Sequence, residues 1–207
     1  MSEESIELLN RALQEELSAV HQYMYFHYHL DDLGYGPLAS LMKRTAIQEM
    51  VHNEELAERI LFLGGEVEME VSDPVQKIHD AKLMLERAKA MELASVAFYN
   101  QAAQKCAKNA DAGSKKIFED LVADEEGHAD TFDQQIQFIE RFGERFLALQ
   151  SIQSDAELHS WSAVDRGSPS IRPVDQVSVS VPGSPGRVTQ KRPLTSFIRK
   201  PVASSSG

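Results

Sequence analysis

The chain has 207 residues, and its 21 Lys and Arg against 32 Asp and Glu give a formal net charge of −11, which disfavours nucleic acid as the main partner. Its single cysteine, Cys106, cannot form an internal disulfide, and no run approaches the ~18 apolar residues of a membrane span. The N-terminus lacks the basic and apolar regions of a signal peptide, so we expect a cytoplasmic protein with neither nucleic acid nor membrane as a partner.

The composition changes sharply near residue 150. Residues 1–150 carry 14 Lys and Arg against 28 Asp and Glu, whereas residues 151–207 carry 7 against 4. Six of the eight prolines lie in the last 55 residues, where Ser, Gly and Arg are also frequent. We therefore expect one folded domain over residues 1–152 and a disordered basic tail over residues 153–207.

Two helices are predicted in the first part of the chain. Apolar residues recur at spacings of three and four after Ser5, which we take as the N-cap, up to Leu30. The turn at residues 34–37 then starts a second helix over residues 38–63, which two glycines end. Because the connection is short, the two helices should be antiparallel neighbours.

A long connection follows, with the start signal Ser72-Asp73-Pro74 after about ten irregular residues. The second helix is ~39 Å long, and ten to thirteen extended residues reach about 33 to 45 Å, so this segment can cross the full length of a bundle. A third helix should have its inward face from Ile78 to Ala103, a fourth from Phe118 to Ile136, and a short fifth from Glu144 to about Ile152. The sequence therefore predicts an all-α four-helix bundle with a long crossover.

Six core-facing residues are related by a single shift of 76 positions: Glu16, Glu49 and His52 in the first half, and Glu92, Glu125 and His128 in the second. A Glu and a His three residues apart share one face of a helix. Carboxylates on a buried stripe are costly unless a metal or a partner compensates them. Oxygen-rich sites with one nitrogen ligand per ion suit iron or manganese, so the pattern predicts a two-metal site between pseudo-symmetric halves.

In the symmetric arrangement, one ion lies between Glu16 and His52 and the other between Glu92 and His128. Glu49 and Glu125 then bridge the two ions. Tyr23 and Tyr99 are also 76 residues apart, and each follows a glutamate by seven residues, so each phenol could hydrogen-bond a ligating carboxylate. The alternative for any single Glu-x-x-His is a solvated helix face, but six residues in register disfavour it.

Residues 1 to about 152 resemble the bacterioferritins, a ferritin-like family. The resemblance rests on residues 14–23, 49–52, 58–63 and 124–128. It implies a ferritin-like bundle, a homo-oligomeric shell of twenty-four subunits, a ferric mineral inside, and a catalytic ferroxidase di-iron site on the six residues named above. It also implies haem b between paired subunits, with Met50 as the axial ligand.

Three residues need separate comment under this resemblance. Met50 is rotated ~100° from Glu49 on the helix and should face away from the di-iron site. The alternative is that this methionine fills a gap at a helix interface and binds no haem. Arg44 and Gln48 stand where a His and an Asp are often found in the family. The path of iron from the site to the cavity is therefore not given by the resemblance.

The resemblance implies iron storage and detoxification by a ferroxidase, an Fe(II):oxygen oxidoreductase. A rubrerythrin-like di-iron peroxidase is an alternative, although the Cys-x-x-Cys pairs of its rubredoxin partner domain are absent. A haem-binding structural bundle is a second, non-enzymatic alternative.

The end of the tail differs in composition from the rest of it. From Gly183 onward there are five Lys or Arg and no acid, and residues 193–201 set three apolar side chains among small polar ones. This segment is similar in kind and placement to the peptides that load ferritin-like cargo into encapsulin nanocompartments. It could equally be a disordered end that contacts the acidic shell or an anionic mineral.

Overall fold

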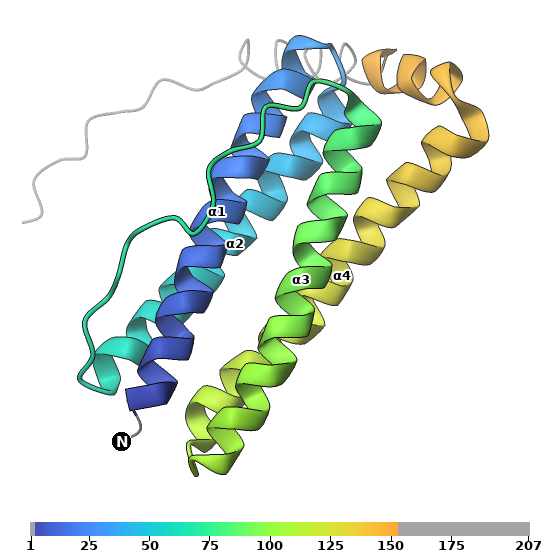
Figure 1. Cartoon of the computed structure of the whole chain (residues 1–207). Coiled ribbons are helices and arrows are strands. Elements are labelled where there is room, and N and C mark those ends of the chain that lie inside the picture. The colour runs from blue at the N-terminus through green and yellow to red at the C-terminus, as the bar shows by residue number, and fades with distance from the viewer. Residues whose placement is uncertain (1–2, 153–207) are drawn as a thin grey trace, which may run out of the picture. The chain divides into compact units, whose positions relative to one another are not determined.

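The computed structural model describes residues 3–152, which form a four-helix bundle followed by a short fifth helix (Figure 1). The main helices are α1 (Glu3–Asp32), α2 (Gly36–Phe62), α3 (Ala81–Lys108) and α4 (Ala112–Phe142), and the fifth covers residues 144–152. The predicted all-α bundle, its long crossover and its fifth helix are confirmed. Within residues 3–152, no helix is both long and apolar enough to cross a bilayer. The tail, with its predicted disorder and docking segment, lies outside the described residues.

Two helical hairpins make up the bundle, α1 with α2 and α3 with α4. Gly34 adopts a φ of +79° in the first turn, and Pro37 lies in the first turn of α2. In the second hairpin, the side chain of Asp111 accepts a hydrogen bond from the backbone N of Ser114 and so caps α4. Both turns are short, which makes the helices of each pair antiparallel neighbours.

Two helix starts differ from the sequence prediction. Ser5 is not an N-cap, because α1 already includes Glu3 and Ser5 is buried within the helix. The third helix begins at Ala81 rather than soon after Pro74, because Asp80 takes the capping position and accepts a hydrogen bond from the backbone N of Leu83. The crossover therefore occupies residues 64–80 and is longer than predicted.

The crossover runs beside α1 and is held there by polar side chains of that helix (Figure 1). Asn10 donates to the carbonyl of Glu66 at 2.9 Å, and Ser18 accepts from the backbone N of Ser72 at 2.9 Å. Gln22 both donates to and accepts from the backbone of residue 76. The three side chains are spaced by four or eight residues, so they share one face of α1 and supply backbone partners to a segment with no secondary structure.

The core consists of two apolar clusters with a polar layer between them. One cluster includes Leu9, Leu13, Leu56, Tyr99 and Phe118, which are all completely or almost completely buried. The other includes Phe26, Leu30, Met42, Met84 and Phe132. The six residues of the 76-residue repeat lie between the two clusters along every helix, and they form the polar layer.

Candidate metal centre

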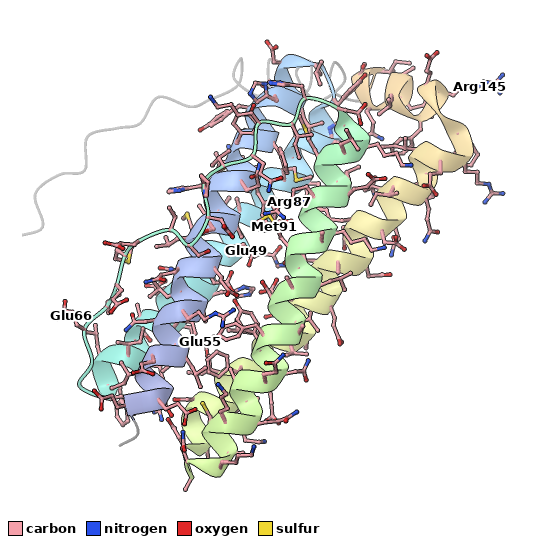
Figure 2. All side chains as sticks on the ribbon, viewed as in Figure 1. Glu49, Glu55, Glu66, Arg87, Met91 and Arg145 are labelled. Carbon is pink, nitrogen blue, oxygen red and sulfur yellow. The ribbon has the colours of Figure 1, made fainter. Side chains whose placement is uncertain are left out.

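The four helices each place one buried glutamate in the polar layer. Glu16 lies on α1, Glu49 on α2, Glu92 on α3 and Glu125 on α4, and none of them is more than 3% exposed. Figure 2 labels Glu49 between the two hairpins, midway along the bundle. His52 and His128 lie one turn beyond Glu49 and Glu125, so each joins its own glutamate in the same layer.

The six side chains form two overlapping groups in which the potential ligand atoms lie within 4.8 Å of one another. One group contains Glu16 and His52, and the other contains Glu92 and His128. Glu49 and Glu125 belong to both groups. The structure therefore brings together every side chain of the predicted two-metal arrangement, while the role of each as a ligand stays a prediction.

Both imidazoles turn Nδ1 toward the two shared carboxylates. Nδ1 of His52 lies 2.8 Å from Glu49 and 3.2 Å from Glu125. Nδ1 of His128 lies 3.0 Å from Glu49 and 3.3 Å from Glu125. The rings are stacked, with centroids 5.9 Å apart. This arrangement has the approximate two-fold symmetry that the sequence repeat predicts.

Each shared carboxylate has one oxygen that makes no hydrogen bond of regular geometry. Oε1 of Glu49 lies 3.0 Å from Nδ1 of His128, and Oε1 of Glu125 lies 3.2 Å from Nδ1 of His52, but neither buried oxygen has a hydrogen bond of regular geometry among the described residues. A buried carboxylate oxygen without a hydrogen bond is unusual in a folded protein. Divalent cations bound between the two groups would satisfy both atoms, so the donor set fits a pair of metal ions.

The protonation of the cluster reflects burial and mutual contact. Burial raises the pKa of Glu16 and of Glu92 well above the usual range of a carboxyl. Burial would also raise the pKa of Glu125, but hydrogen bonds with Glu92 and His128 lower it below its usual range. Burial would lower the pKa of His128, but the close contacts of its ring with the carboxylates of Glu125 and Glu49 outweigh burial and raise this pKa to about 9.

Each tyrosine reaches a carboxylate of the other hairpin. The hydroxyl of Tyr23 on α1 donates to Glu92 on α3 at 2.5 Å, and the hydroxyl of Tyr99 on α3 donates to Glu16 on α1. Burial raises the pKa of both phenols well above the ordinary value, so they remain protonated donors. The two phenols therefore hold the unshared carboxylates from the side opposite the imidazoles.

Other residues singled out in the sequence lie outside this cluster. Met50 is 54% exposed on α2, beside the exposed Ile47 and Val51. Arg44 and Gln48 are exposed on the same helix. Sequence reasoning gave no role to Asp124, whose Oδ2 lies 3.4 Å from Nε2 of His52. The signal for it was present, because Asp124 directly precedes a predicted ligand and its counterpart 76 positions earlier is Gln48.

Comparison with known proteins gives consistent matches over the bundle. The family model of the ferritin-like domain matches residues 6–142. A bacterioferritin of Desulfovibrio desulfuricans is 37% identical over 143 residues, which are 69% of this chain and 80% of the relative. A bacterioferritin of Rhodobacter capsulatus is 38% identical over 145 residues, which are 70% of this chain and 89% of the relative.

Solved structures of bacterioferritins from the same two organisms share the fold. The R. capsulatus structure, described with a metal-free dinuclear site and a haem iron, has a TM-score of 0.70 at 35% identity and covers 73% of this chain and 94% of its own. The D. desulfuricans structure, described with a diiron site in different catalytic states, has a TM-score of 0.70 at 36% identity, with coverages of 71% and 86%.

Metal binding to the six side chains should release protons at neutral pH. The pKa of His128 is raised to about 9, so the metal-free cluster holds protons that ligands must lose before they bind a cation. His128 alone should give up about one proton at pH 7. Burial of His52 is outweighed by contacts with Glu125 and Glu16, which raise the pKa of His52 further still, so the apparent affinity for Zn²⁺ should rise with pH through pH 9. Titration calorimetry in buffers of different ionisation enthalpy measures the release. The same titration above pH 9 is the control and should release fewer protons, whereas no release at pH 7 would contradict the assignment.

Proposed function

Because the chain belongs to the bacterioferritin family of ferritin-like proteins, we propose that it stores iron and detoxifies it as a ferroxidase. The observation that carries this proposal is the pair of overlapping groups of potential ligands, which share two buried carboxylates whose Oε1 atoms make no hydrogen bond of regular geometry among the described residues. In this proposal Glu16, Glu49 and His52, with Glu92, Glu125 and His128, bind two Fe(II) ions as substrate. Each Fe(II) gives one electron to dioxygen or peroxide, and the Fe(III) product passes to a mineral.

The chain's own groups have separate tasks in this reaction. The carboxylates neutralise the charge of the incoming cations, and the imidazoles release protons as the ions bind. Tyr23 and Tyr99 fix the unshared carboxylates of Glu92 and Glu16 through hydrogen bonds from the other hairpin. The buried layer admits two ions at fixed positions and keeps them apart from the apolar clusters on either side.

A rubrerythrin-like peroxidase would also need a pair of iron ions in the polar layer, so the two activities are separated by the oxidant that the protein uses. A structural bundle is disfavoured by the site itself. Four carboxylates buried in the core would weaken a bundle that bound no cation, because each loses its hydration.

The outer face of α2 supports assembly into a homo-oligomer. Ile47, Met50, Val51, Leu61 and Phe62 are each between 48% and 72% exposed on this helix. Ile47, Met50 and Val51 lie within about one turn and Leu61 and Phe62 at the end of the helix, and exposed apolar patches of this kind mark interaction sites. Together with the family membership, they support a shell of twenty-four copies with a mineral cavity.

Haem b is the second group that the family implies, and the outer face of α2 fits it. The Met50 thioether is exposed and lies among apolar side chains, which suits an axial ligand between two copies. When bound, haem would supply a one-electron redox centre. Met50 on each copy would hold it.

The tail is proposed to direct the assembly into an encapsulin compartment in the cytoplasm. Its support is the sequence alone, because residues 193–201 lie outside the described residues and beyond the matched family domain. A short docking segment on many copies of one shell would bind with avidity even if each contact were weak.

Replacing Glu49 with Ala should abolish rapid Fe(II) oxidation, because it removes a carboxylate common to both ligand groups. The ferric-oxo absorbance after Fe(II) is added in air measures the initial rate. Glu55→Ala is the matched control, since Glu55 is an exposed acid on the same helix (Figure 2) and should leave the rate unchanged. An unchanged initial rate in Glu49→Ala would refute the assignment.

Replacing Met50 with Leu should remove or shift the Soret band of the haem-loaded protein without unfolding it. Such volume-conserving swaps usually cost less than ~1.5 kcal/mol, and this side chain is exposed in the single chain. Met69→Leu on the crossover, also at an exposed methionine, is the control and should keep the wild-type spectrum. If the Met50→Leu spectrum equals that of wild type, Met50 is not the axial ligand.

Removing residues 183–207 should abolish co-purification with a co-expressed encapsulin shell while ferroxidase activity persists. Removing only residues 202–207 keeps the predicted docking segment and should preserve packaging. Packaging of the longer truncation would instead favour a tail that only contacts the acidic shell or the mineral.

A further inference from the structure

The two halves of the candidate metal centre are alike at the Nδ1 atoms of His52 and His128 and differ at the Nε2 atoms. Both Nδ1 atoms face Glu49 and Glu125 at 2.8–3.3 Å. On the far side, Oδ2 of Asp124 lies 3.4 Å from Nε2 of His52. Every carboxylate contact of His128 within residues 3–152 is made by its Nδ1 atom and none by Nε2.

The sequence repeat explains this difference. Asp124 precedes Glu125, and the residue related to it by the 76-residue shift is Gln48, which precedes Glu49. Both positions are exposed on the helices that carry the histidines. An aspartate on α4 therefore faces the imidazole of His52 on α2, while the equivalent position on α2 carries the neutral amide of Gln48.

This difference bears on metal affinity. A carboxylate at the far nitrogen of a ligating histidine fixes its tautomer and ring orientation and makes the ligating nitrogen more basic. Loss of such a partner commonly lowers metal affinity by about 10- to 100-fold. His52 has such a partner in Asp124, and His128 does not have one among the described residues.

We propose that Asp124 is a positioning residue that makes the two metal positions unequal, so that the position of Glu16 and His52 retains a divalent ion and that of Glu92 and His128 exchanges it. This inference rests on the two-metal centre proposed above. It gives the two metal positions different tasks. One ion stays and holds the bridging carboxylates in place, while the other position loads and unloads iron.

Single-position variants test the inequality directly. Co²⁺ is titrated without dioxygen into the full-length, mineral-free protein, and its visible absorption reports ligation. His128→Ala leaves the position with the Asp124 partner, and His52→Ala leaves the other. The first variant should bind the remaining Co²⁺ at least about 10-fold more tightly than the second. Equal affinities overturn the proposal.

Exchange of the partner residues tests its cause. In the His128→Ala background, Asp124→Asn should lower Co²⁺ affinity by about 10-fold or more, and in the His52→Ala background, Gln48→Asp should raise it. Glu126→Gln is the matched control, because Glu126 is an exposed acid two residues from Asp124 and its neutralisation should change neither affinity. An equal loss in Glu126→Gln and Asp124→Asn would show a general charge effect and overturn the proposal.

The outcomes separate this inference from the proposed function. Wild-type protein that takes up fewer than two Co²⁺ per chain at the cluster overturns the two-metal centre itself. Two bound ions, with no response to Asp124→Asn or Gln48→Asp, overturn only the role of Asp124. Circular dichroism of each variant confirms the helical bundle before titration.

Discussion

Four carboxylates buried against two imidazoles in the middle of the bundle are the constraint on which the rest of the structure depends. At an effective dielectric constant of about 20, two like charges 4 Å apart repel by about 4 kcal/mol, so four ionised carboxylates without cations would oppose folding. Without metal ions, the cluster lowers this cost by holding protons. Burial raises the pKa of Glu16 and Glu92, while the raised pKa of His128 keeps that imidazole cationic beside the ionised Glu125. Bound protons therefore neutralise part of the negative charge that metal cations would neutralise in the proposed centre.

The same constraint explains how the two hairpins are joined. Each ligand group needs a glutamate from one hairpin together with groups from the other, so the second hairpin must lie in register with the first. The crossover makes this possible by running along α1, where Asn10, Ser18 and Gln22 supply its backbone hydrogen bonds. Tyr23 and Tyr99 then tie the hairpins to each other at the level of the site. The polar residues of α1 thus fix the crossover, and the tyrosines fix the register.

Much of this arrangement was predictable from periodicity, and the exceptions have physical causes. The stripe through Glu49, His52 and Leu56 predicted both the helix and its buried face, because side chains three and four apart share a face. Periodicity does not report which neighbour a face meets, so the crossed bonds of Tyr23 and Tyr99 could not be derived from spacing. It also does not rank competing caps, so Ser5 and Pro74 gave wrong helix starts where Asp80 was the true cap of α3. The contact of Asp124 with His52 joins two helices and required their packing.

The groups in the polar layer differ in their depth. The glutamates are at most 3% exposed, and Tyr23 and Tyr99 are completely buried on the α1 and α3 side. The imidazoles of His52 and His128 come from α2 and α4 and are also buried, although slightly less deeply, at 7% and 8% exposure. In the proposed centre they therefore lie on the α2 and α4 side of the carboxylates. The two-fold pattern is thus kept by the carboxylates and phenols of the proposed metal centre, and it is broken at the rim on the α2 and α4 side, where Asp124 and Gln48 differ.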